Sequence, residues 1–393
     1  MAEARTRIAP DVARIAISAI KEMAMASAAV PDAASLAWGL PSFRTPAHIR
    51  RAVAAALETD ADIGKYALPD GLPALRRAAA AAHEAATGIA VDPDREVMIT
   101  CGNMQGLNAL LQVLVAPGDE VILTDPGFAS HIHQIALCGG TGVWWAMDEA
   151  RGWALDLDAL PGLIGPRTRA IILVSPSNPT GRIFGEAELR RVGEIAAERG
   201  LFVLLDDPYR AFTFENRDRY FNLAAVPALR DRLAYLSTFS KAHAMSGWRL
   251  GTMILPAGLK AQVLKVHDAT IICTPRISQV AGLAALTGPQ HHLAEFEAIL
   301  GRRRDRICAR LDAVAHLFDY VRPEGAYYVF PRIRVAHADS RSFAFDLLQR
   351  AKVAVTPGGA FGPTGEHHVR MAFCVEEDAI DRAFDRIEAL YGR

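Results

Sequence analysis

Six apolar runs stand out along the middle of the chain, and each is followed by a turn or by a segment with helical periodicity. The runs are EVMIT (96–100), EVILTD (120–125), RAIILVSP (169–176), LFVLLDD (201–207), RLAYLSTFS (232–240) and RLGTMIL (249–255). Several are continuously apolar rather than alternating, which is typical of strands that are covered on both faces. The pattern therefore predicts a mostly parallel sheet.

Helices are predicted between these runs. Residues 188–199 carry Leu189, Val192 and Ile195 on one face, and Gly200 ends the segment. A helix here would connect two parallel strands as the crossover of a βαβ unit. Alternating strands and helices predict an α/β domain, in which a functional site lies at the carboxyl ends of the strands.

The chain changes character after Leu286. Residues 302–317 are expected to form a long helix, PEGAYYVFPRI (323–333) a strand, and residues 376–391 an amphipathic helix that ends the chain. A chain of 393 residues is expected to form about two domains. We therefore expect a large domain at 48–286 and a small domain built from 1–47 and 287–393.

Composition excludes several functions. The net charge is −1 with both signs mixed along the chain, which does not favour binding to nucleic acid or to an anionic membrane. No apolar stretch approaches the roughly 18 residues of a membrane span, so we expect a cytoplasmic protein with small-molecule partners. Five cysteines without paired spacing predict neither a disulfide framework nor a zinc site. His131 and His133, on one side of an expected strand, are interpreted as polar contacts, and no metal is expected.

Chemically capable residues follow the predicted strands and would meet in one crevice. Only six of the 43 basic residues are lysines, and one of them, Lys241, follows the apolar run that ends at Ser240. An unprotonated lysine amine can form an imine with a carbonyl compound, which arginine cannot. If that compound carries a phosphate and a ring nitrogen, a helix N-terminus, hydroxyl groups and an arginine suit the phosphate, and Asp206 suits the nitrogen.

The segments SPSNPTG, DDPY and SKAHAMSGWRLG, in this order and at these separations, resemble the pyridoxal-phosphate aminotransferases of class I/II, the aspartate aminotransferase-like family of fold type I. The resemblance extends over nearly the whole chain, since WGLPSFRTPAHI, KYALPDGLPALR, PEGAYYVFP and PGGAFG followed by VRMAF also have counterparts there. It implies a three-layer αβα large domain, a smaller α+β domain, and a pyridoxal 5′-phosphate cofactor.

The resemblance also implies the role of each candidate residue. Lys241 binds the cofactor covalently and moves a proton at the substrate α carbon, with Asp206 and Tyr209 as the other catalytic residues. Arg370, the backbone at Gly39 and the side chain of Asn178 bind the substrate α-carboxylate. The cofactor-binding set is Asn103, Met104, Phe128, Asn178, Asp206, Tyr209, Thr238, Ser240, Lys241 and Arg249, together with Tyr66 from the other subunit of a homodimer.

The reaction expected is transfer of an amino group from an L-α-amino acid to a 2-oxo acid by a ping-pong route. An aromatic-leaning pocket favours a neutral or aromatic donor, and it is formed by Trp38, Leu40, Phe43, Tyr66, Phe128 and Tyr327. Arg276 could meet an acidic substrate side chain or simply a surface carboxylate. The alternative is a β-lyase of cysteine conjugates, or another pyridoxal-phosphate enzyme of secondary metabolism, which would use the same residues.

Two other classes fit the sequence less well. A ligand sensor built on this fold needs an N-terminal DNA-binding domain, and only about 47 residues precede the expected sheet domain. A nicotinamide-dependent dehydrogenase needs a Gly-x-Gly-x-x-Gly turn after its first strand, which the chain lacks.

Overall fold

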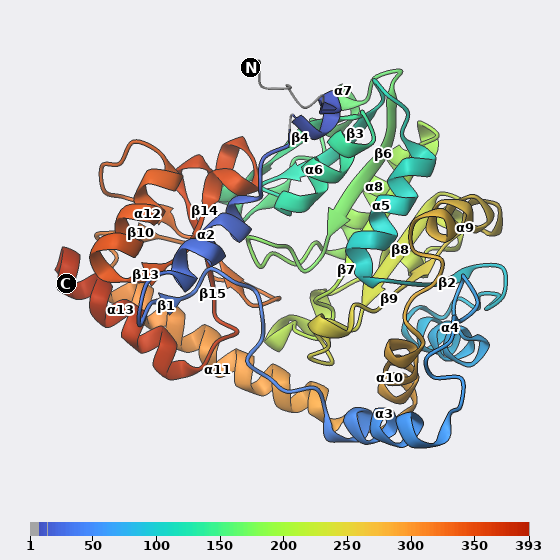
Figure 1. Ribbon diagram of the computed structural model, residues 1–393. Helices are drawn as coiled ribbons and strands as arrows, with labels where there is room; N and C mark the ends of the chain where they lie inside the picture. Colours follow the sequence, from blue (N-terminus) through green and yellow to red (C-terminus); the bar gives the residue numbers. More distant parts are fainter. Residues whose placement is uncertain (1–7, 14, 393) are drawn as a thin grey trace, which may run out of the picture.

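The computed structural model describes residues 8–13 and 15–392, and a large sheet lies at its centre (Figure 1). The described residues form an eight-stranded sheet of order β2-β9-β8-β7-β6-β3-β4-β5. Its strands are β2 (Val97–Thr100), β3 (Glu120–Asp125), β4 (Thr141–Asp148), β5 (Ala154–Leu155), β6 (Thr168–Val174), β7 (Phe202–Asp207), β8 (Leu233–Thr238) and β9 (Gly251–Ile254). The neighbours from β4 to β8 are parallel, whereas β9 is antiparallel to both β8 and β2.

The α/β class with a mostly parallel sheet is confirmed, and all six predicted strands are present. The sequence pattern did not reveal β4. This strand includes Gly142, which weakens strand propensity, and six of its eight residues are not fully buried. Gly142 is suited to its position because a Cβ there would lie 2.2 Å from Ile132 Cδ1.

Helices cover both faces of the sheet. Leu204 and Leu236 pack with α5 (Gly102–Leu114) and α9 (Ala257–Ile271) in one apolar cluster. Val203 and Leu205, which point to the opposite face, pack with α8 (Glu186–Glu198) in another. Because successive strand residues alternate between faces, a continuous apolar run supplies both clusters and fixes a three-layer arrangement.

Of the remaining elements, α6 lies on the same face of the sheet as α5, and most of the others lie along its sides or beyond it (Figure 1). The helices are α1 (Pro10–Ala13), α2 (Ala19–Ala28), α3 (Ala47–Thr59), α4 (Pro73–Thr87), α6 (Ala129–Leu137), α7 (Leu160–Leu163), α10 (Arg276–Thr287), α11 (His291–Ala313), α12 (Ser340–Ala351) and α13 (Glu377–Tyr391). The short strands are β1 (Ala34–Ser35), β10 (Phe318–Asp319), β11 (Tyr328–Val329), β12 (Arg332–Ile333), β13 (Val353–Ala354), β14 (Thr356–Pro357) and β15 (Val369–Ala372). The helix expected at 302–317 thus begins earlier, at His291, and the strand expected at 323–333 is two short strands.

The two ends of the chain share one apolar cluster. Strand β1 pairs in parallel with β13, so that Ala34 lies opposite Val353. Met23 and Leu36 from the N-terminal part are buried in the same cluster as the inner faces of α11, α12 and α13. The division into a large domain at 48–286 and a small domain from 1–47 and 287–393 stays a prediction, and this clustering supports it.

None of the helices within residues 8–13 and 15–392 combines the length and the apolar character that a membrane crossing requires.

Candidate active site

The candidate residues gather at the edge of the sheet where the parallel strands end. Asp206 lies at the end of β7, Thr238 ends β8, and Asn178 follows β6. Arg249 reaches the same edge for a different reason. It precedes β9, and because β9 runs antiparallel to β8, the beginning of β9 lies beside the end of β8.

Lys241 follows β8 and extends toward the N-terminal segment. Its Nζ donates a hydrogen bond to the Gly39 carbonyl at 3.0 Å. Burial lowers the pKa of Lys241 to about 8; the nearby Cys374 thiol opposes this shift, and the cations Arg370 and Arg249 strengthen it. A lysine in this environment can lose its proton near neutral pH and act as a nucleophile or base.

Asp206 is 7% exposed and has two polar neighbours. Its Oδ1 accepts a hydrogen bond from Asn103 Nδ2 at 2.7 Å, and its Oδ2 lies 3.3 Å from His131 Nε2. The sequence analysis placed His131 and His133 on a strand, which is wrong, because both lie on α6. The helix brings the buried His131 ring to Asp206 and, edge-on at 5.2 Å, to the ring of Phe128.

The neighbouring carboxylate, Asp207, faces a different environment. Its Oδ2 accepts hydrogen bonds from the hydroxyls of Tyr220 (2.5 Å) and Tyr235 (2.8 Å). Burial raises the pKa of Asp207 to about 6, and the nearby Arg210 opposes that shift. Successive strand residues point to opposite faces, so Asp206 and Asp207 cannot both serve the same crevice.

An anion-binding corner lies where α5 begins. Gly102 adopts a left-handed conformation (φ 73°), and a Cβ there would lie 2.5 Å from Arg249 Nη2, so the guanidinium packs directly on the first turn. The hydroxyls of Thr238 and Ser240 are 3.0 Å apart beside it. Within the described part of the chain, Arg249 has no carboxylate within ion-pairing distance and bonds only the Ser246 carbonyl. A helix N-terminus with an unpaired arginine and two hydroxyls suits a phosphate group.

Arg370 lies on β15 and is 1% exposed. Its Nη1 donates to Asn178 Oδ1 (3.1 Å), and its Nη2 donates to the Ala37 carbonyl (2.5 Å) and to Thr356 Oγ1 (3.3 Å). Its guanidinium also lies over the Tyr328 ring at 4.5 Å. Among the described residues no carboxylate pairs with this buried cation, so a carboxylate ligand would supply the missing charge.

Gly39 lies between Lys241 and a pair of tyrosines. Its carbonyl also accepts a hydrogen bond from Tyr327 (3.3 Å), and a Cβ at Gly39 would lie 2.0 Å from the Tyr328 hydroxyl oxygen. The hydroxyls of Tyr328 and Tyr209 are 3.0 Å apart. The sequence analysis did not single out Tyr328 or the Arg370 partner Thr356, and the only signal for Tyr328 was the PEGAYY segment.

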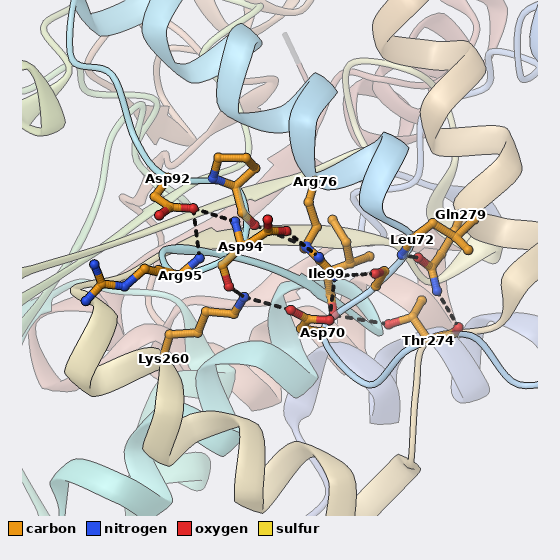
Figure 2. Close-up of polar contacts among 12 residues, drawn as sticks. Asp70, Leu72, Arg76, Asp92, Asp94, Arg95, Ile99, Lys260, Thr274 and Gln279 are labelled. Carbon is orange, nitrogen blue, oxygen red and sulfur yellow. Dashed lines mark hydrogen bonds and ion pairs between the residues drawn. The ribbon is translucent and has the colours of Figure 1, made fainter.

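Two candidates have side chains that are exposed within the chain, although Met104 lies in the first turn of α5 beside Asn103. Tyr66 is 76% exposed and Met104 is 38% exposed. The segment that carries Tyr66 is nevertheless firmly anchored a few residues further along, as Figure 2 shows. Lys260 Nζ binds Asp70 Oδ2 at 2.8 Å, and Arg76 links Asp70 (2.5 Å) to Asp94 (2.6 Å).

Arg276 pairs within its own chain. Its Nη2 lies 3.1 Å from Asp60 Oδ2, at the end of α3. This contact is with a carboxylate of the protein, which is one of the two partners that the sequence left open.

Comparisons with known proteins agree with this geometry. The family model described as aminotransferase class I and II matches residues 31–387. The aspartate aminotransferase of Pyrococcus abyssi is 32% identical over 94% of this chain and 95% of its own, and the aromatic-amino-acid aminotransferase 2 of Thermococcus litoralis is 32% identical over 90% of each. The structure of Thermus thermophilus aspartate aminotransferase with maleate matches with a TM-score of 0.91, at 29% identity over 98% of this chain and 99% of that one.

Proposed function

Because the chain belongs to the class I and II aminotransferase family and is a pyridoxal-phosphate-dependent transaminase, we propose that its donor is an L-α-amino acid with a neutral or aromatic side chain. We further propose that donor and 2-oxo acid react in turn at one site, by a ping-pong route. The proposal is carried by the presence of two groups in one site: a buried Arg370, with which none of the described carboxylates pairs, and a lysine whose pKa is lowered to about 8.

The residues present fit the cofactor. Arg249, Thr238 and Ser240 with the first turn of α5 would hold its phosphate, Asp206 its ring nitrogen, and Phe128 one face of its ring. Asn178 and Tyr209 would hold its phenolic oxygen, and Lys241 its aldehyde carbon. Bound pyridoxal phosphate supplies an aldehyde that bonds amines covalently and a ring that withdraws electrons from the substrate α carbon.

Three side chains of the protein would then have separate roles in the reaction. Arg370 binds the substrate carboxylate and fixes the orientation of the α carbon. Lys241, once its amine is free, would take the proton from the substrate α carbon and move it to the cofactor carbon that carried the aldehyde. Asp206, which accepts a hydrogen bond from Asn103, would pair with the ring nitrogen of the cofactor.

The surroundings support a neutral or aromatic donor. Trp38 and Leu40, which flank Gly39, are 47% and 42% exposed. Arg276, the cation that could have met a second substrate carboxylate, is paired with Asp60. Arg370 and Asn178 form what we call the carboxylate clamp, and an apolar surface beside it favours burial of an apolar substrate side chain.

We also propose a homodimer in which Tyr66 completes the site of the partner. Tyr66 and Leu68 are 76% and 53% exposed on a segment that is anchored by Asp70, and a second copy of the chain would cover them. Mixing inactive Tyr66→Ala and Lys241→Ala subunits should restore about a quarter of the wild-type activity, because half of randomly mixed dimers are hybrids and each hybrid has one intact site. No recovery on mixing, with dimers verified by sedimentation, would contradict the shared site.

The donor class is tested with L-phenylalanine, L-leucine and L-aspartate added singly to the loaded enzyme. A transaminase should stop after one half-reaction, seen as a single loss of the cofactor absorbance, and resume when a 2-oxo acid is added. The two apolar donors should react faster than L-aspartate. Continuous release of ammonia and pyruvate from a cysteine conjugate would instead identify a β-lyase, and a preference for L-aspartate would refute the donor class.

The cytoplasmic location expected from the sequence remains a prediction.

A further inference from the structure

Asp125 ends β3 beside the C-terminal part of the chain, and it is 3% exposed. Its carboxylate accepts hydrogen bonds from the backbone N–H of Thr364 (3.1 and 3.2 Å) and from the Thr364 hydroxyl (2.7 Å). Burial raises the pKa of Asp125, and the two Thr364 donors oppose that shift. Both oxygens of a buried carboxylate are therefore directed at a single residue about 240 positions away along the chain.

The backbones on the two sides of this contact also touch. Gly127, two residues after Asp125, donates its N–H to the Phe361 carbonyl at 2.7 Å. A Cβ at Gly362 (φ 128°) would lie 2.3 Å from Asp125 Oδ1, so only glycine permits this approach. The turn at 125–128 and the loop at 358–367 are thus joined at two points.

The contacts of Asp125 with Thr364 and of Gly127 with Phe361 form a junction between the two segments. Each segment also contacts a residue of the candidate site. On the loop, the Phe361 ring lies 5.0 Å from the guanidinium carbon of Arg370. On the turn, Phe128 follows Gly127, and its ring contacts His131, the neighbour of Asp206. The junction therefore links Phe128, proposed above to stack on the cofactor, with Arg370, proposed above to bind the substrate carboxylate.

We propose that Asp125 is a positioning residue, whose contact with Thr364 holds Phe361 against Arg370 and so aligns the carboxylate clamp with Phe128. The proposal rests on the proposed function in two respects, namely that Arg370 binds the substrate and that Phe128 stacks on the cofactor. Asp125 is not among the residues proposed above to touch the substrate or the cofactor, and it acts through the loop at 358–367.

The test compares two variant pairs. Asp125→Ala removes both acceptors, and Asp125→Asn keeps one oxygen. Thr364→Val removes the hydroxyl donor and keeps the backbone N–H, while Thr364→Ser keeps both and is the matched control. Thr364 is exposed, so its two variants leave the core intact.

Steady-state kinetics are measured with the best donor among L-phenylalanine, L-leucine and L-aspartate. Asp125→Ala should raise the donor KM by about 10-fold or more. Loss of the hydrogen bonds to a charged group shifts the loop at 358–367 by at least one power of ten toward conformations in which Phe361 is not held against Arg370. The kcat should change by less than about 3-fold and the cofactor absorbance should be retained. Thr364→Val should show a smaller rise in KM, and Thr364→Ser should match the wild type.

Hydrogen exchange of the apoprotein gives a readout that needs no activity. The peptide covering 358–367 should exchange faster in Asp125→Ala and Thr364→Val than in the wild type, and Thr364→Ser should not differ. Unchanged exchange together with unchanged KM in folded Thr364→Val and Asp125→Ala would overturn the proposal. If Asp125→Ala does not fold, the Thr364 pair decides alone. A wild-type protein that never reacts with an amino acid refutes the proposed function, and the exchange comparison then decides the positioning claim separately.

Discussion

Lowering the pH from 8 to 5 should destabilise this protein through three buried histidines. His83 on α4, His243 after Lys241 and His267 on α9 are 5%, 7% and 0% exposed. Burial lowers the pKa of each, to about 4, about 3 and about 4 respectively, from an ordinary value of 6.5. In the folded protein they therefore stay neutral at pH values where the unfolded chain takes up protons.

The sign and size of the effect follow from linkage. Between pH 6.5 and about 4 the unfolded state binds more protons than the native state, so the free energy of unfolding falls as the pH falls. From pH 8 to pH 5 each histidine costs about 2 kcal/mol, and the three together about 6 kcal/mol. Asp207 opposes this, because its folded pKa of about 6 lies above the ordinary 3.8 and lets the native state bind a proton first. It offsets about 1 kcal/mol, so these four groups together give a net loss of about 5 kcal/mol.

Urea unfolding, followed by circular dichroism at pH 8 and pH 5, measures this loss. His267→Leu should reduce the loss by about 2 kcal/mol, because one titrating group is removed from the folded interior. His316→Gln, at an exposed position, is the control and should leave the loss unchanged. The reasoning fails if His267→Leu loses as much stability between the two pH values as the wild type does.

Three further predictions concern the site. Arg370→Gln should lower kcat/KM on the order of 10²-fold, mainly through the donor KM, because it removes charge-assisted hydrogen bonds to the substrate; an unchanged KM would contradict the role of Arg370. Gly39→Ala should destabilise the protein by about 1–3 kcal/mol in urea unfolding, because the new Cβ would lie 2.0 Å from the Tyr328 hydroxyl, and adding Tyr328→Phe should recover part of that loss. The rate at which the apoprotein combines with pyridoxal phosphate should rise with pH through about 8, followed by absorbance, because only the unprotonated Lys241 amine reacts; a flat profile from pH 7 to pH 9 would count against it.

Much of the sheet could be predicted from the sequence because its strands are apolar on both faces. The boundaries of β3 were predicted without error, since its apolar run stops at Asp125 before a proline. The partly buried β4 gave no comparable signal. His131 shows the opposite error. Its alternation with His133 imitates a strand, and only the packing of α6 reveals that its ring reaches Asp206.

The residues of the candidate site that come directly after a strand could be predicted from the sequence. Residues that reach the site from distant segments were harder to find, and no local pattern identifies Thr356 or Tyr328 as neighbours of Arg370. The anchoring of the Tyr66 segment by Lys260 was likewise hidden, because Asp70 and Lys260 are far apart in the chain and meet only in the folded protein.

The pairing of β1 with β13 has a consequence for synthesis on the ribosome. Ala34 emerges roughly 320 residues before its partner Val353, which at about 5–20 residues per second means a wait on the order of 15–60 s. During that time Met23 and Leu36, which are fully buried in the finished protein, have no cluster to join. Newly made chains are therefore open to chaperones at their leading end, and a product truncated before residue 353 would keep that apolar end exposed and prone to aggregate.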